Sequence, residues 1–180
     1  MKTRQGFVSN SSSTSFTFCF KGKKLKVLTD LILTKYREKF QRNFDEWHCN
    51  AMDVVRAIEG CINTTKSYDK VALVSIDKII EDDMAYIERL EKDIKEAKEK
   101  PSTNWSGHRN YLLEDKQNLE SKVNKLQKIK KNGLTTVLVI GFGDNDGEVS
   151  GGNVGYAMDY DGRSIDINAK DLVVFTEQNR

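Results

Sequence analysis

The sequence is short of proline, cysteine and long hydrophobic runs, and each shortage excludes a class of structure. Only one proline, Pro101, occurs in 180 residues, so little of the chain is forced out of regular helix or strand. No stretch approaches the roughly 20 apolar residues that a membrane-spanning helix needs. Lys2 and Arg4 are followed by polar residues and not by the apolar segment of a secretory signal. We therefore expect a cytoplasmic protein that does not enter a membrane.

The three cysteines, Cys19, Cys49 and Cys61, are odd in number and do not follow the rhythm of a disulfide framework. They are expected to be reduced thiols, as in most cytoplasmic proteins. His48 and Cys49 with Cys61 could supply three zinc ligands, but their spacing fits none of the compact zinc patterns. A Cys–His nucleophile would also need a residue that orients it, and none is evident. The sequence therefore predicts no metal, no cofactor and no catalytic residue.

Charged residues make up 31% of the chain and hydrophobic residues 38%, which indicates a modest core and much charged surface. The net charge is only +2, but residues 2–42 hold ten basic and two acidic side chains, and residues 134–180 hold three and eight. Either the two ends pair within the fold, or the basic stretch 21–42 binds nucleic acid. In the second case the expected contacts are Lys23, Lys24, Lys26, Lys35 and Arg37.

Hydrophobic periodicity predicts an α+β fold, with residues 1–180 as a single domain. Strands are expected where apolar and small residues alternate or β-branched residues cluster, at 16–20, 70–76, 135–140, 153–160 and 172–175. Apolar spacings of three and four predict helices over 25–40 and 52–62. Glycine-containing turns lie between the later strands. We therefore expect a mainly antiparallel sheet with these two helices packed on it.

The strongest periodicity lies in residues 78–131, where apolar residues recur every three or four positions before a polar break at 100–107 and at nearly the same spacing after it. These residues are Ile80, Met84, Ile87, Leu90, Ile94 and Ala97 before the break, and Leu112, Leu119, Val123, Leu126 and Ile129 after it. Two amphipathic helices joined by a short loop are expected to fold back on each other. The sequence thus predicts a long antiparallel helical hairpin of the coiled-coil kind, inserted between two strands.

Trp105 is unusual, because an indole on a polar turn at the end of a hairpin has little core to enter. Tryptophan is enriched among the residues that anchor protein interfaces. Trp105, His108 and Arg109 are therefore the expected partner contacts at the hairpin tip. A second copy of the chain is an alternative partner, which would give a homodimer. In a different arrangement, Trp105 folds back and covers the end of the two helices.

Residues 141–148 read Gly-Phe-Gly-Asp-Asn-Asp-Gly-Glu and have the composition of a ligand loop. No Gly-Lys-Ser/Thr follows the glycine pair, so a phosphate loop is not indicated. In the register of a calcium-binding EF-hand, Phe142 would occupy the first ligand position, which excludes that motif. Asp146-Gly147 is a strong turn signal, so we predict a hairpin loop. An enzyme that acts through residues 144–148 with a metal or nucleotide remains a further alternative.

The N-terminal segment 1–13 is rich in serine. The most distinctive string in the sequence begins in this segment and ends at Phe16. From residue 4 it reads Arg-Gln-Gly-Phe-Val-Ser-Asn-Ser-Ser-Ser-Thr-Ser-Phe. This string resembles a short motif that opens many small proteins of bacteriophages and some bacteria, with Thr14 in place of the usual serine. The resemblance implies a phage setting and no particular activity. It is carried by Arg4, Gly6, Phe7, Ser9, Asn10, Ser11, Ser12, Ser13 and Phe16.

These observations predict a non-enzymatic phage accessory protein that binds a host or phage protein through its helical hairpin. The first alternative is a nucleic-acid-binding protein that uses the basic stretch 21–42. The second is a minor structural protein of the virion. Binding to nucleic acid would weaken steeply as salt is added, and this behaviour distinguishes the first alternative from a protein partner.

Overall fold

The protein is described by a computed structural model for residues 14–43, 48–63, 73–99, 105–142 and 165–178. Its helices are α1 (Leu25–Leu33), α2 (Ala51–Asn63), α3 (Ile76–Glu99) and α4 (Trp105–Lys131), with a short 3-10 helix η1 (Arg37–Phe40). Its strands are β1 (Thr14–Phe20), β2 (Arg42–Asn43), β3 (His48–Cys49), β4 (Val74–Ser75), β5 (Thr136–Phe142), β6 (Ile167–Asn168) and β7 (Leu172–Gln178). The predicted α+β class is confirmed.

The centre of the fold is a five-stranded sheet in the order β4-β5-β1-β7-β6, and every neighbouring pair is antiparallel. β1 is the middle strand, because Phe20 lies opposite Thr136 of β5 and Leu172 of β7. Successive side chains of a strand point to opposite faces of the sheet. Phe16, Phe18 and Phe20 of β1 therefore point to one face of the sheet, and Cys19 points to the other.

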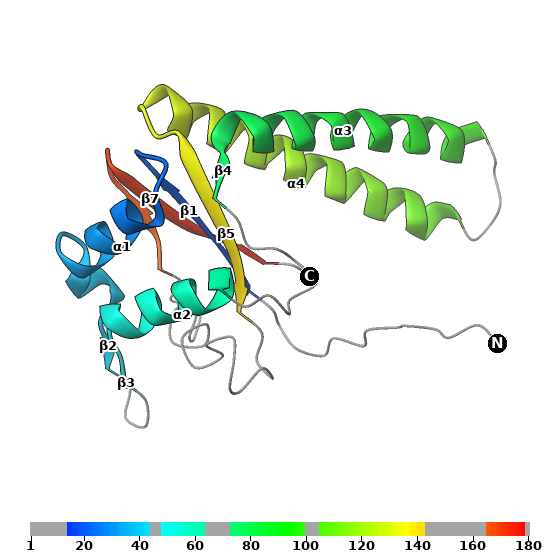
Figure 1. Ribbon diagram of the computed structural model, residues 1–180. Helices are drawn as coiled ribbons and strands as arrows, with labels where there is room; N and C mark the ends of the chain where they lie inside the picture. The colour runs from blue at the N-terminus through cyan, green and yellow to red at the C-terminus, as the bar shows by residue number, and fades with distance from the viewer. Residues whose placement is uncertain (1–13, 44–47, 64–72, 100–104, 143–164, 179–180) are drawn as a thin grey trace.

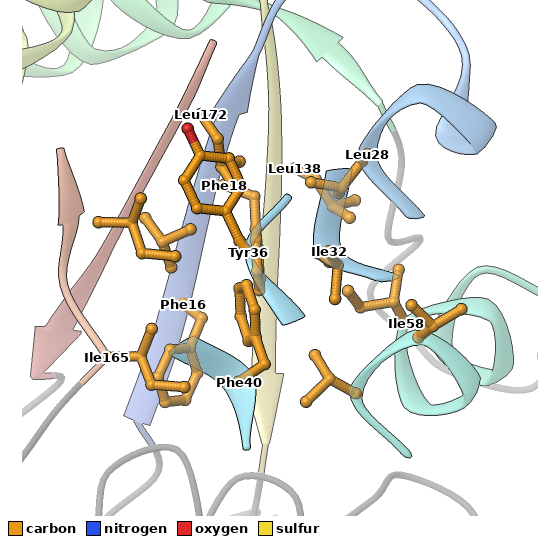
Figure 2. Close-up of a cluster of buried hydrophobic side chains, with 14 of the residues drawn as sticks. Phe16, Phe18, Leu28, Ile32, Tyr36, Phe40, Ile58, Leu138, Ile165 and Leu172 are labelled. Carbon is orange, nitrogen blue, oxygen red and sulfur yellow. The ribbon is translucent and has the colours of Figure 1, made fainter. Parts of the chain in front are cut away.

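One face of the sheet is covered by α1 and α2 (Figure 1). The ring of Phe18 from β1 stacks on that of Phe40 from η1, with the ring centres 6.5 Å apart. Leu28 and Ile32 of α1 and Ile58 of α2 fill the space between the helices and the sheet (Figure 2). All five side chains are fully buried, so this cluster is the main hydrophobic core.

The opposite face of the sheet carries the base of the hairpin formed by α3 and α4. Leu126 of α4 belongs to a buried cluster with Cys19 of β1 and with Val173 and Phe175 of β7. The ammonium of Lys125 lies 3.7 Å from the centre of the Phe175 ring, which is a cation–π contact. The sheet is therefore covered by helices on both faces.

Beyond this base the hairpin leaves the sheet, and its far half extends away from it (Figure 1). Leu90 and Ile94 of α3 pack there with Leu112 of α4 in a buried cluster of their own. The hairpin enters from β4 and returns into β5, which are neighbours in the sheet. The prediction of a long helical hairpin inserted between two strands is thus confirmed.

Ion pairs join the two arms of the hairpin along its length. The ammonium of Lys116 lies 2.8 Å from a carboxylate oxygen of Glu91. Asp83 lies among the apolar residues where the two helices face each other, and its side chain is only 16% exposed. Lys122 approaches it to 3.3 Å, close enough for an ion pair but not aligned as a hydrogen bond. These pairs favour the antiparallel alignment of the arms.

The helix predicted over 25–40 is shorter than expected and ends at Leu33. The hydroxyl of Thr34 donates a 2.6 Å hydrogen bond to the carbonyl four residues earlier, at the helix end. Tyr36 then turns so that its own hydroxyl can donate to Asp171, 2.5 Å away. Of the remaining residues of the predicted helix, 34–36 form a turn and Arg37–Phe40 form η1. A tertiary hydrogen bond therefore overrides the local helical spacing.

The three inner strands of the sheet lie close to their predicted positions, whereas the edge strand β4 is shorter than predicted. Residues 16–20, 135–140 and 172–175 lie almost wholly in β1, β5 and β7, and the helix predicted over 52–62 is α2. The described part of the strand predicted over 70–76 is only Val74–Ser75, because the Ser75 hydroxyl accepts a hydrogen bond from an N–H in the first turn of α3. The strand predicted over 153–160 lies outside the described residues.

Candidate interaction surfaces

Aromatic and charged side chains from both helices lie together on one side of the hairpin. We call Tyr86, Arg89, Tyr111 and Asp115 the tyrosine face. The Arg89 guanidinium lies 5.6 Å from the centre of the Tyr86 ring, and the Tyr86 hydroxyl donates to a carboxylate oxygen of Asp115 at 3.3 Å. Partial burial, followed by the nearby Asp115 carboxylate, raises the pKa of Tyr86 above its usual 10.0.

The two rings of the tyrosine face are open to a partner. Tyr86 is 42% exposed and Tyr111 is 63% exposed. Tyr111 and Asp115 are four residues apart on α4, so they lie on the same side of the helix. The face is therefore one continuous surface made from both arms.

The residues predicted at the hairpin tip lie at the start of α4. Trp105 was predicted to lie on the turn before the helix, but it is the first residue of α4. His108 and Arg109 lie in the same first part of the helix. The loop predicted from the break in periodicity is too long, because the first turn of α4 has no apolar residue at the expected spacing and so was assigned to the loop. The side chains of these three residues lie outside the described part of the chain. Tyr111 was not among the residues predicted from the sequence, although its aromatic ring stands out on a largely polar part of the helix surface.

Seven exposed lysines from three separate parts of the sequence converge at one end of the sheet. The Thr135 N–H donates to the Phe20 carbonyl at 3.1 Å, and the Thr136 hydroxyl donates to the Gly22 carbonyl, which joins the β1–α1 turn to the α4–β5 junction. Leu172 flanks Phe20 from the other side, so the β6–β7 turn lies at the same end (Figure 1). We call the lysines of these segments the lysine corner: Lys21, Lys23, Lys24, Lys26, Lys128, Lys131 and Lys170.

Two carboxylates near this end are already engaged by other cations. Asp77 at the start of α3 pairs with Lys130, and Asp171 pairs with Lys35. The first turn of α1 contains no acidic residue. In the part of the chain that the structure describes, none of the seven lysines forms an ion pair. The lysine corner is therefore a surface of concentrated positive charge.

The basic residues predicted to contact nucleic acid have different surroundings. The ammonium of Lys35 lies 2.6 Å from Asp171, so the basic and acidic ends of the chain do pair within the fold at this point. The hydrogen bond from Lys35, and then that from Tyr36, lowers the pKa of Asp171 below its usual 3.8. Arg37 is exposed in η1. The other three predicted contacts lie in the lysine corner: Lys23, Lys24 and Lys26.

Replacing Asp171 by asparagine is expected to lower the Tm at pH 7 by about 2–4 °C. Because folding lowers the pKa of Asp171, its stabilising effect is present above about pH 4 and is lost as the pH falls through the folded-state value. The Tm difference from the wild type should therefore shrink between pH 7 and pH 3, as measured by circular dichroism. Asp166→Asn, at a nearby exposed carboxylate, is the control. A difference that stayed constant with pH would contradict the assignment.

The other candidate sites predicted from the sequence lie mostly outside the described residues. Segment 1–13 and residues 144–148 lie outside the described residues, whereas Phe16 of the N-terminal motif is fully buried in β1. Within the described ranges, no group of three or more His, Cys, Asp or Glu side chains is placed to hold a metal ion. No helix in those ranges combines the length and apolar character needed to cross a bilayer. Cys19 is a buried thiol in β1.

Comparison with known proteins adds no family to these observations. No family model matches the chain, and neither curated proteins nor solved structures give a match. The tyrosine face and the lysine corner are therefore the two features of the described structure that bear on function.

Proposed function

We propose that this chain is a non-enzymatic phage accessory protein that binds a host or phage protein through its helical hairpin. The observation that carries the proposal is the pair of exposed tyrosines, Tyr86 and Tyr111, on a hairpin that extends beyond the sheet (Figure 1). The phage setting is supported by the resemblance of the N-terminal string. The binding role is supported by the chemistry of the hairpin surface.

The exposed rings are not part of the buried core of the hairpin. The far half of the hairpin already has its own buried cluster around Leu90. Of the large hydrophobic side chains that are exposed in the described residues, Met84, Tyr86 and Tyr111 lie on the hairpin, and only Met52 lies elsewhere. Tyrosine offers a large, rigid contact area and a hydroxyl, and it is frequent among residues that dominate binding energy. These rings therefore fit a protein interface.

Arg89 and Asp115 complete this surface. They place one charge of each sign beside Tyr86: the Arg89 guanidinium lies over the ring, and the Asp115 carboxylate accepts from the hydroxyl. Charged groups around an aromatic centre set the orientation of a partner and its rate of association more than its affinity. The expected partner surface is therefore an apolar pocket with both acidic and basic groups at its edge.

We also propose that the hairpin is a coiled coil that serves as a stiff arm. The α3 residues that face α4 are separated alternately by four and three positions, which is the heptad spacing. With 24 residues, α3 is about 36 Å long. A stiff arm holds the tyrosine face in one orientation and so reduces the entropy lost on binding. The residues concerned are Ile76, Ile80, Asp83, Ile87, Leu90, Ile94 and Ala97.

The proposal is tested by affinity capture from nuclease-treated host lysate on the immobilised full-length chain, with quantitative mass spectrometry. Tyr86→Ala/Tyr111→Ala is expected to reduce capture of the specific partner at least about tenfold, because truncating central aromatic anchors costs more than 1.4 kcal/mol of binding energy. Trp105→Ala/His108→Ala tests the tip in the same way.

Met52→Ala is the matched control, because Met52 on α2 is 44% exposed but lies away from the hairpin. It should capture the partner at the wild-type level. Circular dichroism establishes that each variant keeps its helices. Unchanged capture by both hairpin variants would overturn the proposal. Loss of self-association alone, measured by analytical ultracentrifugation, would assign the face to a second copy of the chain.

A further inference from the structure

We infer that the lysine corner binds the phosphate backbone of double-stranded nucleic acid without sequence preference. This surface shares no residue with the tyrosine face, so the inference stands or falls independently of the proposed function. Three properties of the corner support it: the convergence of three separate segments, the absence of ion pairs at its lysines within the described residues, and the composition of its side chains.

The positions of these lysines are not explained by helix stability alone. Lysines in the last turn of α4, such as Lys128 and Lys131, do favour the negative end of a helix dipole. Lys24 and Lys26 lie at the start of α1, where the dipole is positive and a cation is unfavourable. The fold nevertheless brings both groups to one end of the sheet. An external polyanion would stabilise this concentration of charge.

Within the described residues none of the seven lysines forms an ion pair, which leaves the corner available to such a ligand. Two of the carboxylates near the corner, Asp77 and Asp171, already pair with Lys130 and Lys35. Each contact with a phosphate releases a counterion from the nucleic acid, which supplies most of the free energy of sequence-independent binding. Several lysines close together on different turns can follow successive phosphates along a strand.

The types of side chain indicate which polyanion fits. All seven charges of the corner are lysines, which act as point charges on phosphates, whereas sequence-specific recognition commonly uses the bidentate guanidinium of arginine. Single-stranded nucleic acid is usually bound with exposed aromatic rings that stack on its bases. In the described residues, the exposed large hydrophobic side chains are Met52, Met84, Tyr86 and Tyr111, and none belongs to the corner. A duplex backbone therefore fits better than a single strand.

The same composition argues against a lipid surface. Stable attachment to an anionic membrane normally combines basic residues with apolar side chains that enter the bilayer, or with a second anchor. The described segments of the corner present lysines without such a side chain. Vesicles are nevertheless included in the experiment, because anionic headgroups share the phosphate chemistry.

The test measures fluorescence anisotropy of a labelled 20-base-pair DNA duplex titrated with the full-length chain. We expect a Kd of about 1–100 μM near 0.15 M salt, with the logarithm of the binding constant falling against the logarithm of salt with a slope of about −5. Two duplexes of unrelated sequence should bind equally, and a single strand of the same length should bind more weakly. Vesicles containing phosphatidylserine should not compete.

Variants test whether the corner is composite. Lys24→Gln and Lys131→Gln, one from each of two segments, should each weaken duplex binding and reduce the salt slope by about one, and the double variant should reduce it by about two. Lys92→Gln/Lys95→Gln, at exposed lysines in the far half of α3, removes the same charge and should leave the slope unchanged. Lys24→Gln should not destabilise the fold, because it removes a cation from a helix start.

Several outcomes would overturn the inference. The corner has no such role if the duplex fails to bind, or if the control variant loses as much affinity as the corner variants. Tighter binding of the single strand would assign base stacking elsewhere on the chain. Effective competition by vesicles would assign the corner to anionic lipid. Tyr86→Ala/Tyr111→Ala should leave duplex binding unchanged, which separates this result from the test of the proposed function.

Discussion

Phe18→Ala is expected to lower the free energy of unfolding by about 3–5 kcal/mol, among the largest effects of any single substitution in this chain. Phe18 is fully buried in the central strand of the sheet, and its ring stacks on that of Phe40. Removing it takes away contacts with α1, η1 and the neighbouring strands at once (Figure 2). The surrounding helices cannot move inward far enough to fill the space. Denaturant unfolding followed by circular dichroism measures the loss.

A milder change at the same position separates the effect of volume from that of the aromatic stack. Phe18→Leu keeps an apolar side chain of similar size and is expected to cost about 1–1.5 kcal/mol. Met52→Ala, at a half-exposed position on α2, should change stability by no more than about 0.5 kcal/mol. A Phe18→Ala variant as stable as Met52→Ala would show that the layer beneath α1 and α2 is not the main core.

The parts of the fold that the sequence predicted are those in which local spacing and burial agree. Phe16, Phe18 and Phe20 alternate with smaller residues, and all three are buried on one face of β1. The repeat of apolar residues in 78–131 likewise places one stripe of each helix against the other. In β1, and at most positions of the hairpin, a side chain's position in the repeat determines which way it points. Met84 is the exception, because it is 44% exposed and Asp83 faces the other arm instead.

The candidate surfaces depended on contacts that no local pattern contains. Tyr36 leaves the predicted helix to reach Asp171, which is 135 positions away in the sequence. The lysine corner exists because the pairing of β1 with β5 and β7 brings three short segments together. The sequence showed an excess of basic residues near its start but not the contribution of Lys128 and Lys131. Lys35, one of the five predicted contacts, was instead engaged within the fold.

The prediction for the hairpin compares the same substitution at its base and in its far half. Leu126→Ala is expected to lower the free energy of unfolding of the sheet by about 2–5 kcal/mol, as is usual for a buried leucine. Leu126 is fully buried in the cluster that contains Cys19 and Phe175, so it belongs to the hairpin and the sheet together. Leu90 is almost as deeply buried, but its cluster contains residues of α3 and α4 only.

Leu90→Ala should therefore open the far half of the hairpin without weakening the sheet to the same degree. We expect faster amide hydrogen exchange in α3 and α4, with a change of less than about 1 kcal/mol in the opening free energy of β1 and β5, because separate clusters are nearly independent. Leu126→Ala should accelerate exchange in both regions. Hydrogen exchange followed by mass spectrometry resolves these segments. If both variants destabilised the sheet equally, the hairpin would be an inseparable part of one cooperative core. If only Leu126→Ala did so, the far half could open, or be ordered by a partner, while the sheet remained folded.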